Sequence, residues 1–178
     1  ITYRLTEAPL TAGKRTSIPD YVTESGFTEN ISGRSKVGAA PTLQELYVYD
    51  RLTDTVWQLK ADQLPGIYDL PDYLADYPAA HKKAQAHPPL RTVAYLSISW
   101  SPGHNLAVID IRAQDNKDRW SMKLNGETGK LSLIDRQHDD AWIAGPGIGG
   151  GFGGSTLGFI DENTLYYQSE ATGYSHLY

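Results

Sequence analysis

The feature that most constrains the fold is a two-stranded unit that occurs twice. Each copy opens with an aromatic residue and a polar turn, first at Trp100–Leu106 and again at Phe159–Leu165. A strand, a polar loop and a second strand led by an aromatic residue follow, and these second strands are Trp120–Leu124 and Tyr174–Tyr178. A strand–turn–strand unit that recurs in this way predicts the blades of a β-propeller.

A hairpin pattern supports the same fold. Leu46–Asp50 and Thr55–Leu59 form one predicted hairpin, and Met122–Leu124 and Lys130–Ile134 repeat it without a gap. We interpret these pairs as the outer strands of two successive blades. The second copy of the larger unit reaches Tyr178, inside a blade, so the expected fold class is all-β: a partial β-propeller of about two to three blades of antiparallel strands. Residues 1–178 are expected to be part of a single propeller domain.

Composition agrees with strands and turns. The chain has 12 Tyr and 4 Trp against 3 Phe, with 17 Gly and 10 Pro. Tyr and Trp suit half-buried strands, where the ring packs inward and the polar tip reaches water. We therefore expect Trp100, Trp120, Phe159 and Tyr174 to pack between blades.

Residues 61–92 interrupt the strand pattern. Turn signals at Leu64–Gly66 and Leu70–Asp72 precede Tyr73–Gln85, which can hold one or two helical turns broken by Pro78. We interpret 61–92 as an ordered loop and short-helix insertion between blades. It either packs on the propeller rim or forms an element that faces substrate or another subunit.

Charge and residue types exclude several classes of function. A net charge of -5 makes a nucleic-acid surface improbable, and no apolar run approaches the length of a membrane span. The absence of cysteine excludes disulfides, thiolate metal sites and a cysteine nucleophile. The chain begins at Ile1, as in the middle of a longer protein, which leaves export open.

No motif for a cofactor or a nucleophile stands out. The glycine run Gly145–Gly154 lacks the following helix that a dinucleotide site needs, so we expect a mobile or tightly turned loop between blades. No G-x-S-x-G elbow is present, and the histidines have no metal-ligand spacing. We therefore expect no cofactor, no metal and no catalytic residue in this chain.

Two charged stretches have alternative interpretations. Asp115–Arg119 is either a solvated hairpin tip or a source of buried ion pairs that join neighbouring blades. Arg136–Trp142 leads from the outer strand of one blade toward the inner strand of the next. Its adjacent carboxylates, Asp139 and Asp140, either hold a cation such as a peptide α-ammonium or accept backbone N–H bonds within a turn.

These residues together resemble a known family, the dipeptidyl-peptidase-IV branch of the prolyl oligopeptidase serine peptidases, in its N-terminal β-propeller and most closely in bacterial members. The resemblance extends over nearly the whole chain, and its motifs are Tyr21–Thr28, Lys36–Gly38, Leu46–Asp50, Trp100–Pro102, Asp115–Trp120, Asp135–Trp142 and Gln168–Tyr178.

The resemblance implies that this chain takes part in peptide hydrolysis but does not carry the catalytic residues. In the family, an α/β-hydrolase domain follows the propeller and carries the Ser, Asp and His residues, and that domain is absent from this chain. The propeller restricts access to the active site, and a Glu-Glu pair holds the free amino end of the substrate. This chain has no Glu-Glu; Asp161–Glu162 lies in a hairpin turn, so Asp139, Asp140 and Arg136 are the candidate substrate-binding residues.

The expected function is that of a non-catalytic propeller fragment of a serine exopeptidase, which gates the active site and helps to bind the substrate's N-terminal end. Its expected partners are its own catalytic α/β-hydrolase domain and short peptides, with a homo-oligomer left open and no nucleic acid or membrane span. The family implies a periplasmic or secreted location. The alternative is a non-enzymatic propeller that acts as a protein-interaction scaffold.

Overall fold

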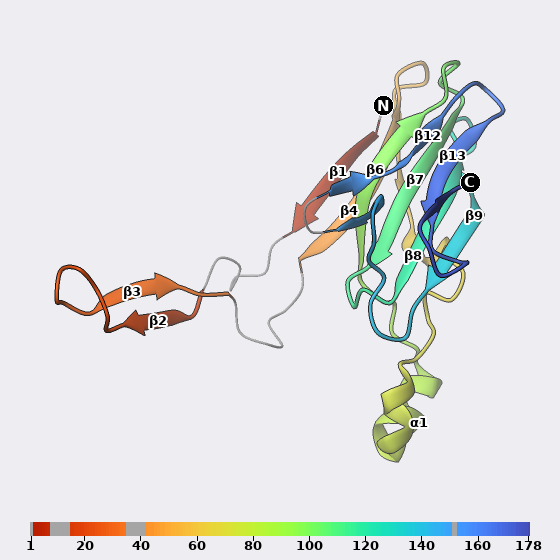
Figure 1. Ribbon diagram of the computed structural model, residues 1–178. Coiled ribbons are helices and arrows are strands. Elements are labelled where there is room, and N and C mark those ends of the chain that lie inside the picture. Colours follow the sequence, from red (N-terminus) through yellow and green to blue (C-terminus); the bar gives the residue numbers. More distant parts are fainter. Residues whose placement is uncertain (1, 8–14, 35–41, 151–152) are drawn as a thin grey trace. The chain divides into compact units, whose positions relative to one another are not determined.

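The computed structural model describes residues 2–7, 15–34, 42–150 and 153–178, and their regular structure is mainly antiparallel strands (Figure 1). The chain divides into two compact units, Ile1–Leu5 with Gln44–Tyr178 and, separately, Thr6–Leu43. In the smaller unit, β2 (Ser17–Asp20) and β3 (Glu29–Ser32) form an antiparallel hairpin. The family motif at Lys36–Gly38 lies outside the described residues.

One complete blade lies at the centre of the larger unit. It consists of β6 (Val93–Trp100), β7 (Leu106–Ala113), β8 (Asp118–Asn125) and β9 (Leu131–His138), which pair as an antiparallel meander in sequence order (Figure 1). The strand β7 and most of β8 are buried, as expected for strands covered on both faces. Four strands in this order are the unit of a propeller, so the all-β fragment of propeller-like blades is confirmed.

Partial blades accompany this sheet. Before it, β1 (Thr2–Glu7), β4 (Leu43–Asp50) and β5 (Thr55–Leu59) pair in the order β1–β4–β5. After it, β12 (Leu157–Phe159), β13 (Leu165–Ser169) and β14 (His176–Leu177) form a three-stranded sheet. The glycine run contributes a short hairpin of β10 (Ile148–Gly150) and β11 (Gly153–Ser155).

A single apolar cluster joins the first sheet to the complete blade. Its buried members come from β4 to β9 and from the chain just after β5: Leu46, Val48, Leu59, Leu64, Ile67, Val93, Tyr95, Ala107, Ile109, Ile111, Ala113, Trp120, Met122, Leu124 and Leu131. Burial of such side chains contributes on the order of 1.5–3 kcal/mol each for the larger ones. Leu131 is a member of this cluster, so the start of β9 packs against the core.

The stretch between β5 and β6 is ordered. It contains the 3-10 helices η1 (Ala61–Gln63) and η2 (Asp72–Asp76) and the helix α1 (Pro78–Ala86), which lies beyond the strand ends in Figure 1. The helical turns expected in Tyr73–Gln85 are present, and they are interrupted at the non-helical residue Tyr77, directly before Pro78. Pro78 begins α1, because a proline at the first helical position has a suitable φ and needs no N–H partner.

The aromatic residues expected between blades do not all lie there. Trp120 is fully buried, Trp100 packs against the core, and Phe159 is half-buried. Tyr174, in contrast, is 77% exposed, because it lies in the turn before the two-residue strand β14. Tyr178 instead stacks on Tyr167 at a ring-centroid distance of 5.8 Å.

Candidate functional site

A hollow of about 460 Å³ lies at the end of the complete blade and is hereafter called the pocket. The last half of β9, the connection to β10 and the turn after β13 form its walls. The residues that line it are Asp135, Arg136, Gln137, His138, Asp139, Trp142, Ile143, Ile148, Glu170, Ala171 and Gly173. Ile143 and Ile148 are buried, whereas Trp142 is 61% exposed.

Asp139 lines the pocket and also shapes its wall. Its Oδ1 atom accepts hydrogen bonds from the backbone N–H groups of Ala141 at 2.7 Å and Trp142 at 2.8 Å. The hydrogen bonds from Trp142 and Ala141 hold the pKa of Asp139 below its usual value, so the carboxylate is ionised. The turn expected as the alternative for Asp139–Asp140 is therefore present, and the substrate contact stays a prediction.

Asp140 lies apart from Asp139. Its side chain is 89% exposed, it is not among the pocket-lining residues, and its Oδ1 lies 3.2 Å from Nε2 of His138. It borders a smaller hollow of about 50 Å³ with Asp69, Asp72 and Asp115. The two candidate carboxylates thus face different hollows.

Arg136 lines the pocket, but its guanidinium group is bound to two carboxylates. Its Nε donates to Asp118 Oδ1 at 2.9 Å, and its Nη2 donates to Asp69 Oδ2 at 2.8 Å. Burial lowers the pKa of Arg136, and these hydrogen bonds outweigh that effect and raise it. Arg136 therefore connects β9 to the 61–92 segment.

Asp118 is the centre of a wider ionic network. Its side chain is 1% exposed and pairs with Arg91 at 2.6 Å, with Arg136 at 2.9 Å and with Nδ1 of His138 at 3.0 Å. Burial raises its pKa, but the hydrogen bonds from Arg136, Arg91 and His138 outweigh burial and lower it. In turn, the hydrogen bond to Asp118 raises the pKa of His138 above its usual value.

Asp115–Arg119 forms buried ion pairs, the alternative expected for it, but these pairs lie within the complete blade or reach the segment before β6 and do not join two blades. Asp118 joins the blade to Arg91 of the preceding segment, and Arg119 forms a fully buried pair with Asp110. Arg119 also donates to the backbone O atom of Gln168 in the next sheet at 2.8 Å. Only the tip of this stretch is solvated, since Asp115 is 39% exposed.

Sequence reasoning missed the acidic residue on the opposite wall. Glu170 follows β13, and its carboxylate lies so close to Gly145 that a Cβ atom there would collide with it. Gly145 also has a φ of 149°, so this position suits glycine for two reasons. The family motif Gln168–Tyr178 contains Glu170, but a single acidic residue in a turn forms no sequence pattern that predicts a binding role.

Within residues 2–7, 15–34, 42–150 and 153–178, no group of His, Cys, Asp and Glu is arranged to hold a metal ion. None of the helices in these ranges has the length and apolar character needed to cross a membrane.

The architecture is that of β-propeller blades, and comparison with known proteins agrees with it. No family model and no curated protein matches the chain. The chain is similar to a crystal structure from Bacteroides ovatus, described as a candidate dipeptidyl aminopeptidase IV, with a TM-score of 0.54 and 15% identity. The similarity covers 99% of this chain and 20% of that one, so this chain spans a fifth of that protein's length. At this identity the similarity supports the fold.

Proposed function

We propose that this chain is part of the propeller of a serine exopeptidase of the dipeptidyl-peptidase-IV type, and that the pocket binds the positively charged amino end of a peptide. The observation that carries the proposal is the pocket's charge. Asp135, Asp139 and Glu170 line it, while the two basic residues of its lining, Arg136 and His138, are paired with carboxylates outside the pocket. The structural similarity to the Bacteroides ovatus protein supports the same class.

The pocket offers an ammonium group both charge and an apolar surface. The backbone bonds of Asp139 use Oδ1, so Oδ2 takes no part in them, and Glu170 lines the other wall. The exposed ring of Trp142 adds a face on which a cation can lie. In a concave site the attraction between carboxylate and ammonium exceeds its value in open water.

This role makes the chain a binding and gating element, and the nucleophile belongs to a separate hydrolase domain. We expect the isolated chain to hydrolyse no peptide substrate, because it has no nucleophile elbow. The measurement is release of chromophore from a dipeptide p-nitroanilide by the purified chain. Hydrolysis that a serine-directed inhibitor blocks would contradict this expectation.

The proposal is tested by Asp139→Asn and Glu170→Gln in the full-length protein that contains this chain. Each loses one charge-assisted hydrogen bond to the ammonium group, about 1.5 kcal/mol or more, so KM for free-amine dipeptide substrates should rise about tenfold. Substrates with an N-acetylated amino end should show unchanged kinetics, because they carry no charge to lose. Asp140→Asn, outside the pocket, is compared in the same assay.

A matched control separates binding from turn formation. Asp161 accepts backbone N–H bonds from Asn163 and Thr164, both at 2.8 Å, in the same pattern as Asp139, but it does not line the pocket. Asp161→Asn should therefore leave KM unchanged. If Asp139→Asn and Glu170→Gln keep wild-type KM on free-amine substrates, the pocket is not the site for the amino end. If the full-length protein hydrolyses no peptide, the peptidase assignment fails.

A further inference from the structure

Arg119 is a buried arginine whose hydrogen bonds reach three parts of the chain. It is fully buried on β8, and its Nε donates to Asp110 Oδ1 on β7 at 2.8 Å. Its Nη1 atom donates to Oε1 of Gln137 at 3.3 Å and to the backbone O atom of Gln168 at 2.8 Å. One guanidinium group therefore contacts β7 and β9 of its own blade and β13 of the next sheet.

Two of these acceptors belong to opposite walls of the pocket. Gln137 lines the pocket on β9, and Gln168 lies two residues before Glu170, which lines the other wall. Gln137 also donates from Nε2 to the Gln168 O atom at 3.2 Å and to Asp135 Oδ2 at 2.8 Å. The Gln168 carbonyl group is thus held by two donors, both from the complete blade.

The buried pair of Asp110 and Arg119 has a well-defined hydrogen-bond geometry. Asp110 is fully buried, and it accepts hydrogen bonds from Arg119 and from Ser155 Oγ on β11. Only the planar fork of arginine presents several donors in a fixed geometry, whereas a lysine offers a single ammonium point. A buried ion pair adds little net stability compared with apolar residues of similar volume. We therefore expect its main effect to be on the positions of the groups that it contacts.

We infer that Arg119 is a positioning residue that fixes the two walls of the pocket relative to one another and thereby sets the affinity for the ligand. The inference rests on the proposed function only for the identity of that ligand, the amino end of a peptide. Arg119 itself makes no contact with substrate, since it does not line the pocket.

The first test is Arg119→Lys in the full-length protein, with KM and kcat measured on a free-amine dipeptide p-nitroanilide. Lysine keeps the charge beside Asp110 but loses the fork, so we expect KM to rise about tenfold with kcat nearly unchanged. Amide hydrogen exchange supplies a second readout. The Ser169–Gly173 turn should exchange faster in this variant, while β7 keeps its protection.

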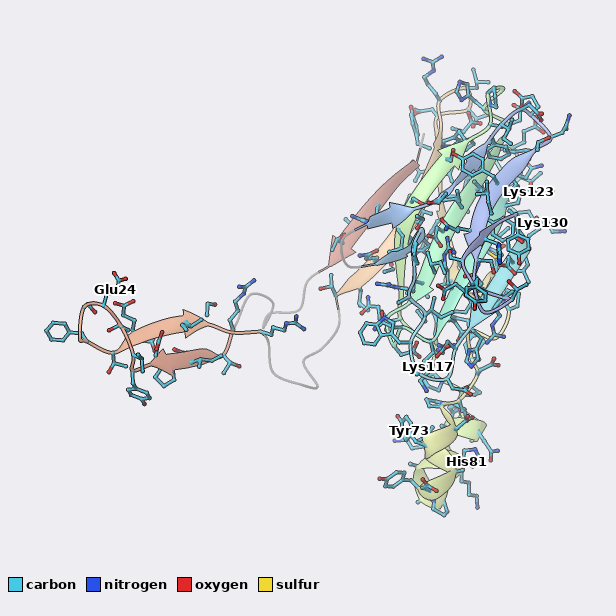
Figure 2. The ribbon with its side chains drawn as sticks, viewed as in Figure 1. Glu24, Tyr73, His81, Lys117, Lys123 and Lys130 are labelled. Atoms are coloured by element: carbon cyan, nitrogen blue, oxygen red, sulfur yellow. The ribbon has the colours of Figure 1, made fainter. Side chains whose placement is uncertain are left out.

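A double variant, Asp110→Leu with Arg119→Met, is the second test and is needed if the Arg119→Lys protein does not fold. It replaces the buried pair with apolar side chains, a change that folds tolerate well, and it should give the same rise in KM and the same faster exchange. Lys123→Met removes a cation from the exposed face of the same strand and is the matched control (Figure 2). It should change neither readout.

Unchanged exchange of the Ser169–Gly173 turn in both variants would overturn the inference, as would wild-type KM in an active enzyme. A full-length protein without peptidase activity would instead refute the proposed function. The exchange measurement then still decides whether Arg119 holds the two walls.

Discussion

Replacing Trp120 with alanine should lower the free energy of unfolding by about 3–5 kcal/mol, the largest effect expected for any single substitution in this chain. Trp120 is fully buried within the cluster that joins the first sheet to the complete blade. Its Nε1 donates to the backbone O atom of Pro65 at 2.9 Å, which attaches the 61–92 segment to β8. Alanine therefore leaves a cavity and breaks this attachment.

The Trp120 ring also lies close to two guanidinium groups. The Cζ atoms of Arg91 and Arg136 lie 5.8 Å and 6.0 Å from its ring centroid, within the range of a cation–π interaction. Trp120→Phe keeps an aromatic face but removes the donor to Pro65. It should cost less than alanine, about 1–3 kcal/mol, from smaller volume and one unsatisfied carbonyl group.

The measurement is urea-induced unfolding of the full chain, followed by intrinsic fluorescence and circular dichroism. Trp142→Ala is the control, because Trp142 is 61% exposed and should change the free energy of unfolding by about 0.5 kcal/mol or less. If Trp120→Ala unfolds at the same urea concentration as the wild type, the two sheets do not depend on this ring.

The strands of the fold could be predicted because their signals are local. Thr55–Leu59 coincides with β5, and the predicted start of its partner at Leu46 differs from that of β4 by only three residues. Asp50 begins the turn between them by accepting from the backbone N–H of Leu52, and Asn125 does the same for Glu127 in the later hairpin. Such turns depend on residues two positions apart, which a sequence displays directly.

The ionic network was only partly predictable because its partners are distant in the chain. Asp118 and Arg119 could be identified as candidates for buried pairs, but Arg91 lies 27 residues before Asp118. Arg136 and Asp69 are 67 residues apart. Nothing local indicates that the 61–92 segment folds back onto a blade, so the sequence does not reveal that the guanidinium group of Arg136 joins this segment to β9.

The pocket is also only partly predictable from the sequence, because its two walls come from separate parts of the chain. Its first wall, Asp135–Trp142, is predictable because the path between two blades must cross one face of a propeller. Its second wall required the next sheet, in which Glu170 follows β13. Because a turn places its side chains by backbone geometry, an isolated acid there carries no periodic signal. The distance between the two walls depends on Arg119, which no local pattern connects to Gln168.

Replacing Asp118 with alanine should lower the free energy of unfolding by about 3 kcal/mol near neutral pH, because it leaves two arginines without their buried partner. Arg91 and Arg136 are 13% and 26% exposed, so water solvates them only in part after the loss. Asp115→Ala is the control. Its carboxylate is 39% exposed, pairs with Arg91 and accepts the backbone N–H of Lys117, so its loss should cost less than about 1 kcal/mol.

The cost of Asp118→Ala should depend on pH in a defined direction. Although burial opposes ionisation, the hydrogen bonds from Arg136, Arg91 and His138 lower the pKa of Asp118 below 3.8. Its stabilisation is therefore present above pH 3.8 and is lost as the pH falls through the lowered pKa. The hydrogen bond to Asp118 raises the pKa of His138 above 6.5, so the contribution of His138 is complete below pH 6.5 and is lost as the pH rises through the raised value.

The lowered pKa of Asp118 and the raised pKa of His138 together define a pH range in which the network is most stabilising. The difference in free energy of unfolding between wild type and Asp118→Ala should be largest between pH 3.8 and 6.5, where Asp118 is ionised and His138 is protonated. It should decrease strongly on the acid side and only slightly on the alkaline side, because His138 is 49% exposed and its interaction is screened. Urea unfolding of both proteins across this range measures the difference, and a difference that grows as the pH falls below 3.8 would show that Asp118 is not the centre of the network.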